Sequence, residues 1–141
     1  MPLTRVYLPL TPSDLDLLTE GGTLGPAPLA GHAVTPALGS PGLTTDEEEL
    51  EYQAWVAATE EAAGTVADGV RRVVAAADVD SEAVTRPAQP EGPTRVQLTV
   101  PVEREQLVSF HVDEEPGATG TADLLWYDVT ELDDVRALLA R

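Results

Sequence analysis

Two histidines are the side chains of this 141-residue chain best suited to acid–base chemistry near neutral pH. His32 directly follows Gly31, beside a Gly- and Pro-rich stretch of the kind in which binding sites often form. A neutral imidazole there could bind a ligand or act as a base. The same pattern fits a half-buried side chain that bonds a loop carbonyl. We favour this structural interpretation and keep the pocket-lining one as its alternative.

His111 lies in the segment SFHVDEE, two residues before Asp113. Alternation along a strand would place both side chains on one face, which is a usable geometry for a divalent metal. Zinc sites normally need three or four protein ligands, so such a site would require both histidines to meet. A solvated acidic strand end explains the segment equally well. We therefore predict neither a metal site nor a cofactor.

Further candidates come from residues that follow or begin apolar runs. Asp78 follows a buried run, where catalytic acids can lie. The same position suits a second role, in which Asp78 and Asp80 cap a short turn at Ser81. Together, the side chains that could line one pocket are Tyr7, His32, Thr35, Asp78, His111 and Asp113.

Acidic residues dominate the charge of the chain, with 25 Asp and Glu against 8 Arg and a net charge of −17. This charge repels phosphate backbones, so we expect no direct nucleic-acid binding. It suits a basic protein surface, and salt would weaken such pairing. A nucleic-acid mimic, a high-salt cytoplasm and plain solubility remain alternatives. The candidate partner surface begins an acidic helix and consists of Glu47, Glu48, Glu49 and Glu51.

The length and composition indicate one domain over residues 1–141, with 43% hydrophobic residues. The chain has no cysteine, and we find neither a run of about 18 apolar residues nor a signal peptide. We therefore expect a cytoplasmic protein with no membrane contact.

Hydrophobic periodicity predicts the elements that position these residues. A Thr11–Asp14 cap starts a first helix with Leu15 and Leu18 on its buried side. Thr45 starts the longest helix, and Thr130 caps a last one that runs to Arg141. The inner face of the longest helix is expected to comprise Tyr52, Trp55, Val56, Thr59, Ala62, Ala63 and Val66. Strands are expected at 5–10, 32–35, 71–79, 95–100, 108–112 and 124–129.

These elements amount to an α+β domain with a mixed sheet of about six strands and three helices. Mobile loops are expected near 37–44, 85–94 and 113–123, where Gly, Pro and polar residues gather. Trp126 and Tyr127 are neighbours on one strand and must face opposite sides. One of them is therefore a candidate for an exposed contact patch.

Four motifs resemble those of an uncharacterised family of small acidic actinobacterial proteins. They are RVYLPLT from Arg5, HAVTPAL from His32, EEELEY from Glu47 and LLWY from Leu124. The resemblance covers most of the chain and implies no particular activity.

The order of elements also resembles small bacterial domains of the ADP-ribosyltransferase-like fold, which hold NAD between their first strands. In that family the first strand usually carries a histidine after an aromatic residue, whereas Leu8 follows Tyr7 here. The resemblance implies a pocket lined by Tyr7, His32 and Thr35, with Asp78 or Asp113 as acids.

Two functions follow from the sequence, and it does not decide whether the protein is an enzyme. The first is a non-catalytic binding or interaction module that uses the acidic helix. The alternative is an NAD- or nucleotide-binding protein, or an ADP-ribosyltransferase-like enzyme, that uses the region of the first strand and His32.

Overall fold

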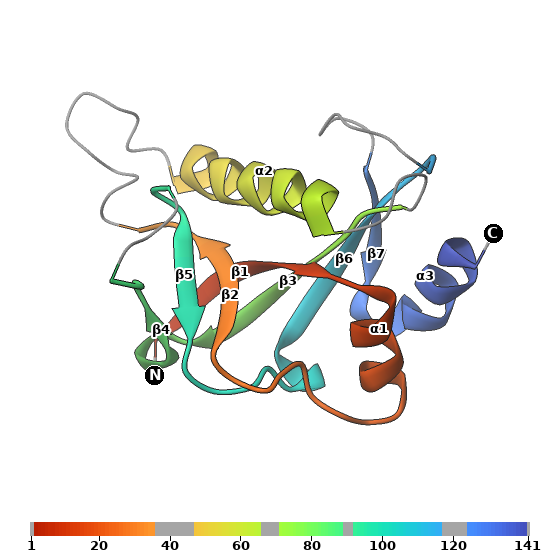
Figure 1. Cartoon of the computed structure of the whole chain (residues 1–141), viewed down its shortest axis with the longest axis horizontal. Helices are drawn as coiled ribbons and strands as arrows, with labels where there is room; N and C mark the ends of the chain where they lie inside the picture. The colour runs from red at the N-terminus through yellow and green to blue at the C-terminus, as the bar shows by residue number, and fades with distance from the viewer. Residues whose placement is uncertain (1, 36–46, 66–70, 89–91, 117–123, 141) are drawn as a thin grey trace.

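Seven strands pair in one sheet in the computed structural model of the chain (Figure 1), which describes residues 2–35, 47–65, 71–88, 92–116 and 124–140. The strand order is β4-β5-β2-β1-β3-β6-β7 and every pairing is antiparallel. The strands are β1 (Leu3–Leu10), β2 (Leu29–Ala33), β3 (Val73–Asp80), β4 (Val84–Thr85), β5 (Arg95–Leu98), β6 (Leu107–Asp113) and β7 (Leu124–Asp128). The predicted α+β class is confirmed, with an antiparallel rather than mixed sheet and β4 as an additional strand.

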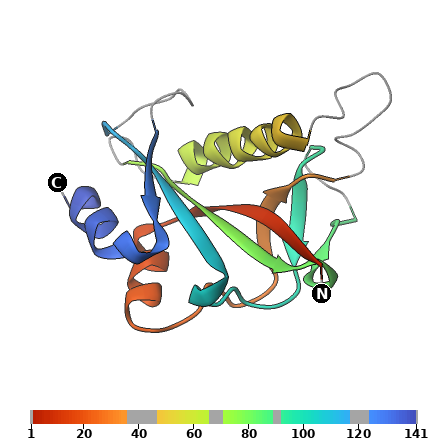
Figure 2. The same ribbon diagram turned by 180° about the vertical axis from the view of Figure 1, so that it is seen from behind.

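Helices cover both faces of the sheet (Figures 1 and 2). One face carries α2 (Glu47–Thr65), and the other carries α1 (Pro12–Thr19) and α3 (Leu132–Leu139). Short 3₁₀ turns connect strands at Ser81–Ala83 (η1) and Arg104–Gln106 (η2), and a third, Val129–Glu131 (η3), joins β7 to α3. Within the described ranges, none of the helices combines the length and apolar content that a membrane crossing requires.

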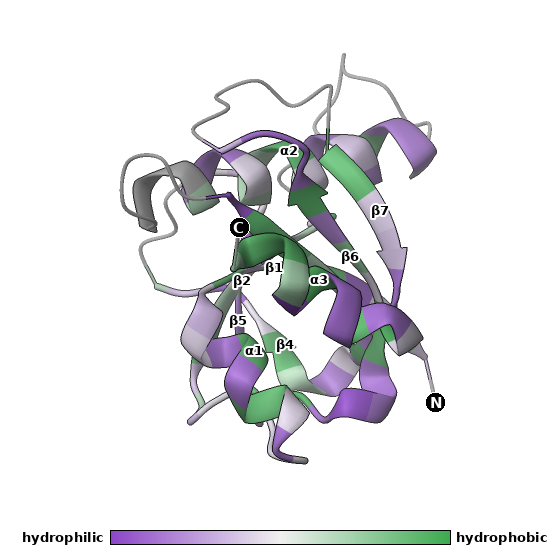
Figure 3. Ribbon diagram, turned by 90° about the vertical axis from the view of Figure 1, so that its right-hand side faces the viewer, coloured by the Kyte–Doolittle hydropathy of each residue, from purple (hydrophilic) through white to green (hydrophobic). Residues whose placement is uncertain are grey.

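Strand alternation divides the core into two layers. Val6 and Leu8 of β1 belong to the larger cluster with α1 and α3, whereas Tyr7 between them belongs to the smaller cluster under α2. Figure 3 shows hydrophobic residues gathered in the strands between α2 and the α1–α3 pair. Side chains on the α2 side of the sheet are therefore the ones that can form a site with this helix.

The start of α1 follows from its local sequence. Thr11 accepts a hydrogen bond from the backbone N–H of Asp14, whose carboxylate accepts one from the backbone N–H of Thr11. Leu15 and Leu18 are buried, and Gly21 ends the segment with a φ of 81°. The predicted cap and inner face of this helix are confirmed.

The predicted inner face of α2 is only partly right. The described buried residues of the helix are Leu50, Ala54, Ala58, Thr59 and Ala62. Tyr52 is 54% exposed, contrary to prediction, because small alanines rather than large rings face the sheet. The predicted start at Thr45 and the loop at 37–44 lie outside the described residues.

Four other predicted features differ in the structure, among them the expectation that Pro9 ends the first strand or places it at the sheet edge. Asp128, not Thr130, caps the last helical segment, which begins as η3 before α3. Thr94 is buried although it was assigned to an exposed loop, and Asp113 belongs to β6 rather than to the loop that follows. Pro9 neither ends β1 nor lies at the sheet edge, because the register pairs it with Val74 on β3.

Candidate binding site

Tyr7 and His32 are the two candidate residues that the sheet brings together most directly. They pair in the register of β1 and β2. His32 is only 4% exposed, and its Nδ1 lies 2.9 Å from Thr94 Oγ1. Its Nε2 lies 3.5 Å from a carboxylate oxygen of Glu61, which also pairs with Arg95. His32 therefore ties β2 to β5 and to α2.

Burial lowers the pKa of His32, with the nearby Arg95 acting in the same direction and Glu61 opposing both. The imidazole is therefore neutral at pH 7. Both ring nitrogens face protein groups, so this geometry matches the structural interpretation of His32. Thr35 lies nearby and is also buried, with its hydroxyl donating to the carbonyl of Pro93.

Asp78 is held by Arg5 across the β1–β3 pairing. Arg5 Nε donates to one carboxylate oxygen at 2.7 Å and Nη2 donates to the other at 2.9 Å. These hydrogen bonds lower the pKa of Asp78. Asp80, by contrast, caps η1 by accepting from the backbone N–H of Glu82.

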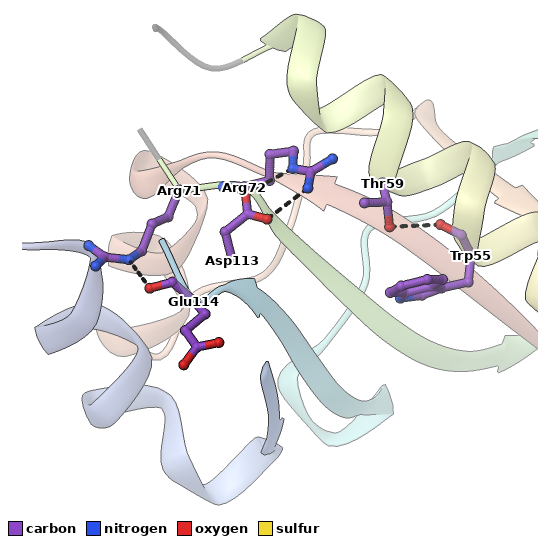
Figure 4. Close-up of polar contacts among 6 residues, drawn as sticks. All are labelled: Trp55, Thr59, Arg71, Arg72, Asp113 and Glu114. Atoms are coloured by element: carbon purple, nitrogen blue, oxygen red, sulfur yellow. Dashed lines mark hydrogen bonds and ion pairs between the residues drawn. The ribbon is translucent and has the colours of Figure 1, made fainter. Parts of the chain in front are cut away.

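Asp113 is fully engaged inside the protein (Figure 4). Its carboxylate accepts bonds of 2.8 and 2.7 Å from Arg72 Nε and Nη2, and one of 2.7 Å from the backbone N–H of Arg72. Arg72 and Asp113 are each 1% exposed. This pair joins the beginning of β3 to the end of β6, and nothing in the sequence pattern singled out Arg72.

His111 lies apart from His32. Strands β1 and β3 separate their two strands, a spacing of about 14 Å at the usual ~4.8 Å per strand. Ser109 Oγ lies 3.2 Å from His111 Nε2, and burial lowers the pKa of His111. Among the described residues, no group of three or more His, Asp or Glu side chains is placed to hold a metal ion.

An open pocket of about 560 Å³ lies between α2 and the strands β1, β3, β6 and β7. We call it the aromatic pocket because five rings line it. They come from Tyr7, Tyr52, Trp55, His111 and Trp126. Two of the six sequence candidates, Tyr7 and His111, therefore do share one hollow.

The cross-strand register explains why the sheet is hollow here. Ala76 on β3 lies between Tyr7 on β1 and Ser109 on β6, so two small side chains form the floor beside the rings. In the neighbouring row, His111 pairs with Trp126 on β7. Trp126 is 61% exposed, so it is the exposed member that the Trp–Tyr alternation predicted.

The rings pack at defined angles. The centroids of Tyr52 and Trp55 are 5.7 Å apart with an interplanar angle of 30°, a stacked pair. Trp55 meets His111 edge-on, at 5.7 Å and 65°. Such contacts hold the rings in fixed orientations around the hollow.

Charged groups border the rings on one side. Glu48 and Glu51 of α2 line the pocket together with Arg5. Burial raises the pKa of Tyr7, and the charge of Glu51 adds to that shift. A second hollow of about 600 Å³ shares Arg5 and Glu51 with the aromatic pocket, so the two hollows adjoin beside α2, and we call them together the groove along α2.

A family model matches residues 4–123 of the chain, under the description of a family of unknown function, DUF6912. The chain belongs to this family. The predicted membership of an uncharacterised family is thereby confirmed. No curated protein and no solved structure matched the chain.

Proposed function

We propose that this DUF6912 protein is a non-catalytic binding module that holds a basic segment of a partner protein in the groove along α2. The observation that carries the proposal is the aromatic pocket, where the exposed rings of Tyr52 and Trp126 stand beside the carboxylates of α2. Exposed aromatic residues that cluster around a hollow are typical anchors of protein interfaces.

The state of the candidate acid–base groups supports binding over catalysis. Asp78 and Asp113 are each held by two side-chain hydrogen bonds from an arginine. His32 is enclosed by Thr94 and Glu61. A general acid or base must reach a substrate proton, and these groups contact protein atoms instead.

The charge of the groove supports a basic partner. Glu48 and Glu49 are exposed on the first turns of α2 and Glu51 is half-buried at the groove itself. The net charge of −17 would attract a basic segment over a longer range and speed its encounter. Arg5 does not cancel this field, because Asp78 neutralises it within the same groove.

The proposal is tested by measuring the affinity of a basic peptide at several salt concentrations, with a matched charge control. The probe is a short fluorescent arginine-rich peptide, and we expect Glu48→Gln/Glu51→Gln, which removes both carboxylates of the aromatic pocket, to weaken its binding by about tenfold. The control, Glu20→Gln/Glu105→Gln, removes the same charge from residues that line none of the hollows described above. Equal weakening by both variants would mean non-specific attraction and would contradict the proposal.

Nucleotide binding near Tyr7 and His32 is the second hypothesis, and their pairing in register is the observation in its favour. A thermal-shift series with NAD and ADP-ribose separates the two. A ligand at 100 times its dissociation constant adds ~2.7 kcal/mol to the free energy of unfolding. A saturable shift with either ligand, lost in His32→Gln, would replace the binding-module proposal with a nucleotide site.

A further inference from the structure

We infer that the aromatic pocket receives an N-methylated ammonium group, such as that of a methylated lysine. The inference rests on the proposed function, because it names the chemical group that a basic partner would place in this pocket. It is carried by the ring arrangement, by the charge of the lining and by the scarcity of hydrogen-bond acceptors there.

The rings surround the hollow from several elements. Trp55 and Tyr52 stand on α2, Tyr7 lies on β1 and Trp126 on β7, so ring surfaces meet the hollow from helix and sheet alike. A cation over the face of an aromatic ring is attracted by the ring quadrupole, most strongly for tryptophan. Several rings around one hollow add such attractions for a single cation.

The charges at the pocket favour a cation over an anion. Both carboxylates, Glu48 and Glu51, lie on the rim, and the one guanidinium, Arg5, has its charge balanced by both oxygens of Asp78. The imidazole of His111 is neutral at pH 7, since burial lowers its pKa. No unbalanced positive group of the lining therefore opposes a bound cation.

Apart from the two carboxylates, the floor of the pocket on the sheet offers few acceptors, which favours a methylated ammonium over a free one at the rings. A primary ammonium brings three N–H donors, and leaving any of them unpaired in a partly buried site costs free energy. Ser109 Oγ is already in contact with His111 Nε2, and the floor beside it is the methyl group of Ala76. A trimethylammonium group has no N–H to satisfy, and its methyl groups can contact the rings directly.

Tryptophan fluorescence provides a direct readout, because both tryptophans of the chain line the pocket. The titrants are a short basic peptide with one central trimethyllysine, the same peptide with lysine, and choline as a small-molecule source of the group. We expect the methylated peptide to bind about tenfold more tightly than its unmodified twin. Trp126→Ala should abolish this preference, whereas Val100→Ala, which truncates another exposed apolar side chain, should keep it.

The outcomes separate the inference from the proposed function. Equal binding of both peptides would overturn the inference and leave a basic-segment module standing. Saturable binding of choline without either peptide would uphold the ligand class and overturn the protein partner. The wild-type protein must first be shown to be folded by circular dichroism. If its fluorescence then changes with none of the titrants at low salt, both the inference and the proposed function are overturned.

Discussion

Individual side chains in this protein separate into those that hold the fold and those that remain accessible. Asp113 and His32, both candidates for chemistry from sequence, face protein partners inside the structure. Trp126 and Tyr52 are exposed and mark the hollow. Burial and hydrogen bonding, which depend on residues far apart in sequence, decide to which group a side chain belongs.

The buried Arg72–Asp113 pair is expected to respond asymmetrically to substitution. Asp113→Asn leaves the guanidinium of Arg72 buried without its counter-charge and should lower the free energy of unfolding by about 3–5 kcal/mol. The double variant Arg72→Met/Asp113→Leu removes both charges and should recover most of that loss. Urea unfolding followed by circular dichroism measures both, and a double variant no better than the single would contradict the argument.

The free energy of unfolding should fall as the pH drops from about 7.5 to about 5.5. The pKa values of His32 and His111 are both lowered in the folded protein, chiefly by burial. Below about pH 6.5 the unfolded chain therefore binds protons that the folded chain does not, which favours unfolding. The lowered pKa values of Asp78 and Asp128 act only at more acidic pH. Urea midpoints across this range should become less pH-dependent in His32→Gln and in His111→Gln.

At the scale of elements, local signals predicted some boundaries well. The Thr11–Asp14 capping box and the buried Leu15 and Leu18 follow from three-residue spacing alone, and they are confirmed. The orientation of α2 was predicted less well, because its buried face is decided by contact with Tyr7, Val74 and Ala76 of the sheet, which lie far from it in sequence. The sequence of α2 has apolar residues on two overlapping faces of the helix. In the structure, the face with Ala54, Ala58 and Ala62 packs against the sheet.

The close contact between β2 and β1 makes Gly31 a sensitive position. A Cβ atom at Gly31 would lie 2.8 Å from Leu8 Cδ2 and 3.3 Å from the carbonyl oxygen of Tyr7. Gly31→Ala should therefore destabilise the protein by about 1–3 kcal/mol, as overpacking does in other cores. Adding Leu8→Val should restore part of this loss in thermal unfolding, and an undiminished loss would place the clash at the Tyr7 backbone instead.

Across the whole molecule, class and charge were predictable from sequence, but the site was not. Composition and periodicity led to an α+β domain, since both are properties of the chain itself. The aromatic pocket needs Tyr7, Trp55 and Trp126 from three elements to meet, and only the strand order brings them together. Tyr7, His111 and the exposed residue of the Trp126–Tyr127 pair were each singled out from the sequence, but nothing in the sequence joined them.

The excess of negative charge should weaken the folded state at low ionic strength. Mutual repulsion among 25 acidic residues is screened by salt, with a Debye length of ~30 Å at ~10 mM and ~8 Å at ~150 mM. We expect a gain on the order of 1 kcal/mol in the free energy of unfolding between these conditions. Urea titrations at the two NaCl concentrations measure it, and an unchanged midpoint would show that paired charges dominate the surface.

The alanines on the buried face of α2 have a consequence for the shape of the hollow beside this helix. Ala58 and Ala62 act as spacers of minimal height between the helix and the strands. A larger side chain at either position would push α2 away from the strands and widen the hollow beside Trp55. Under the proposed function, such a change would alter which groups fit the pocket, although Ala58 and Ala62 do not line it.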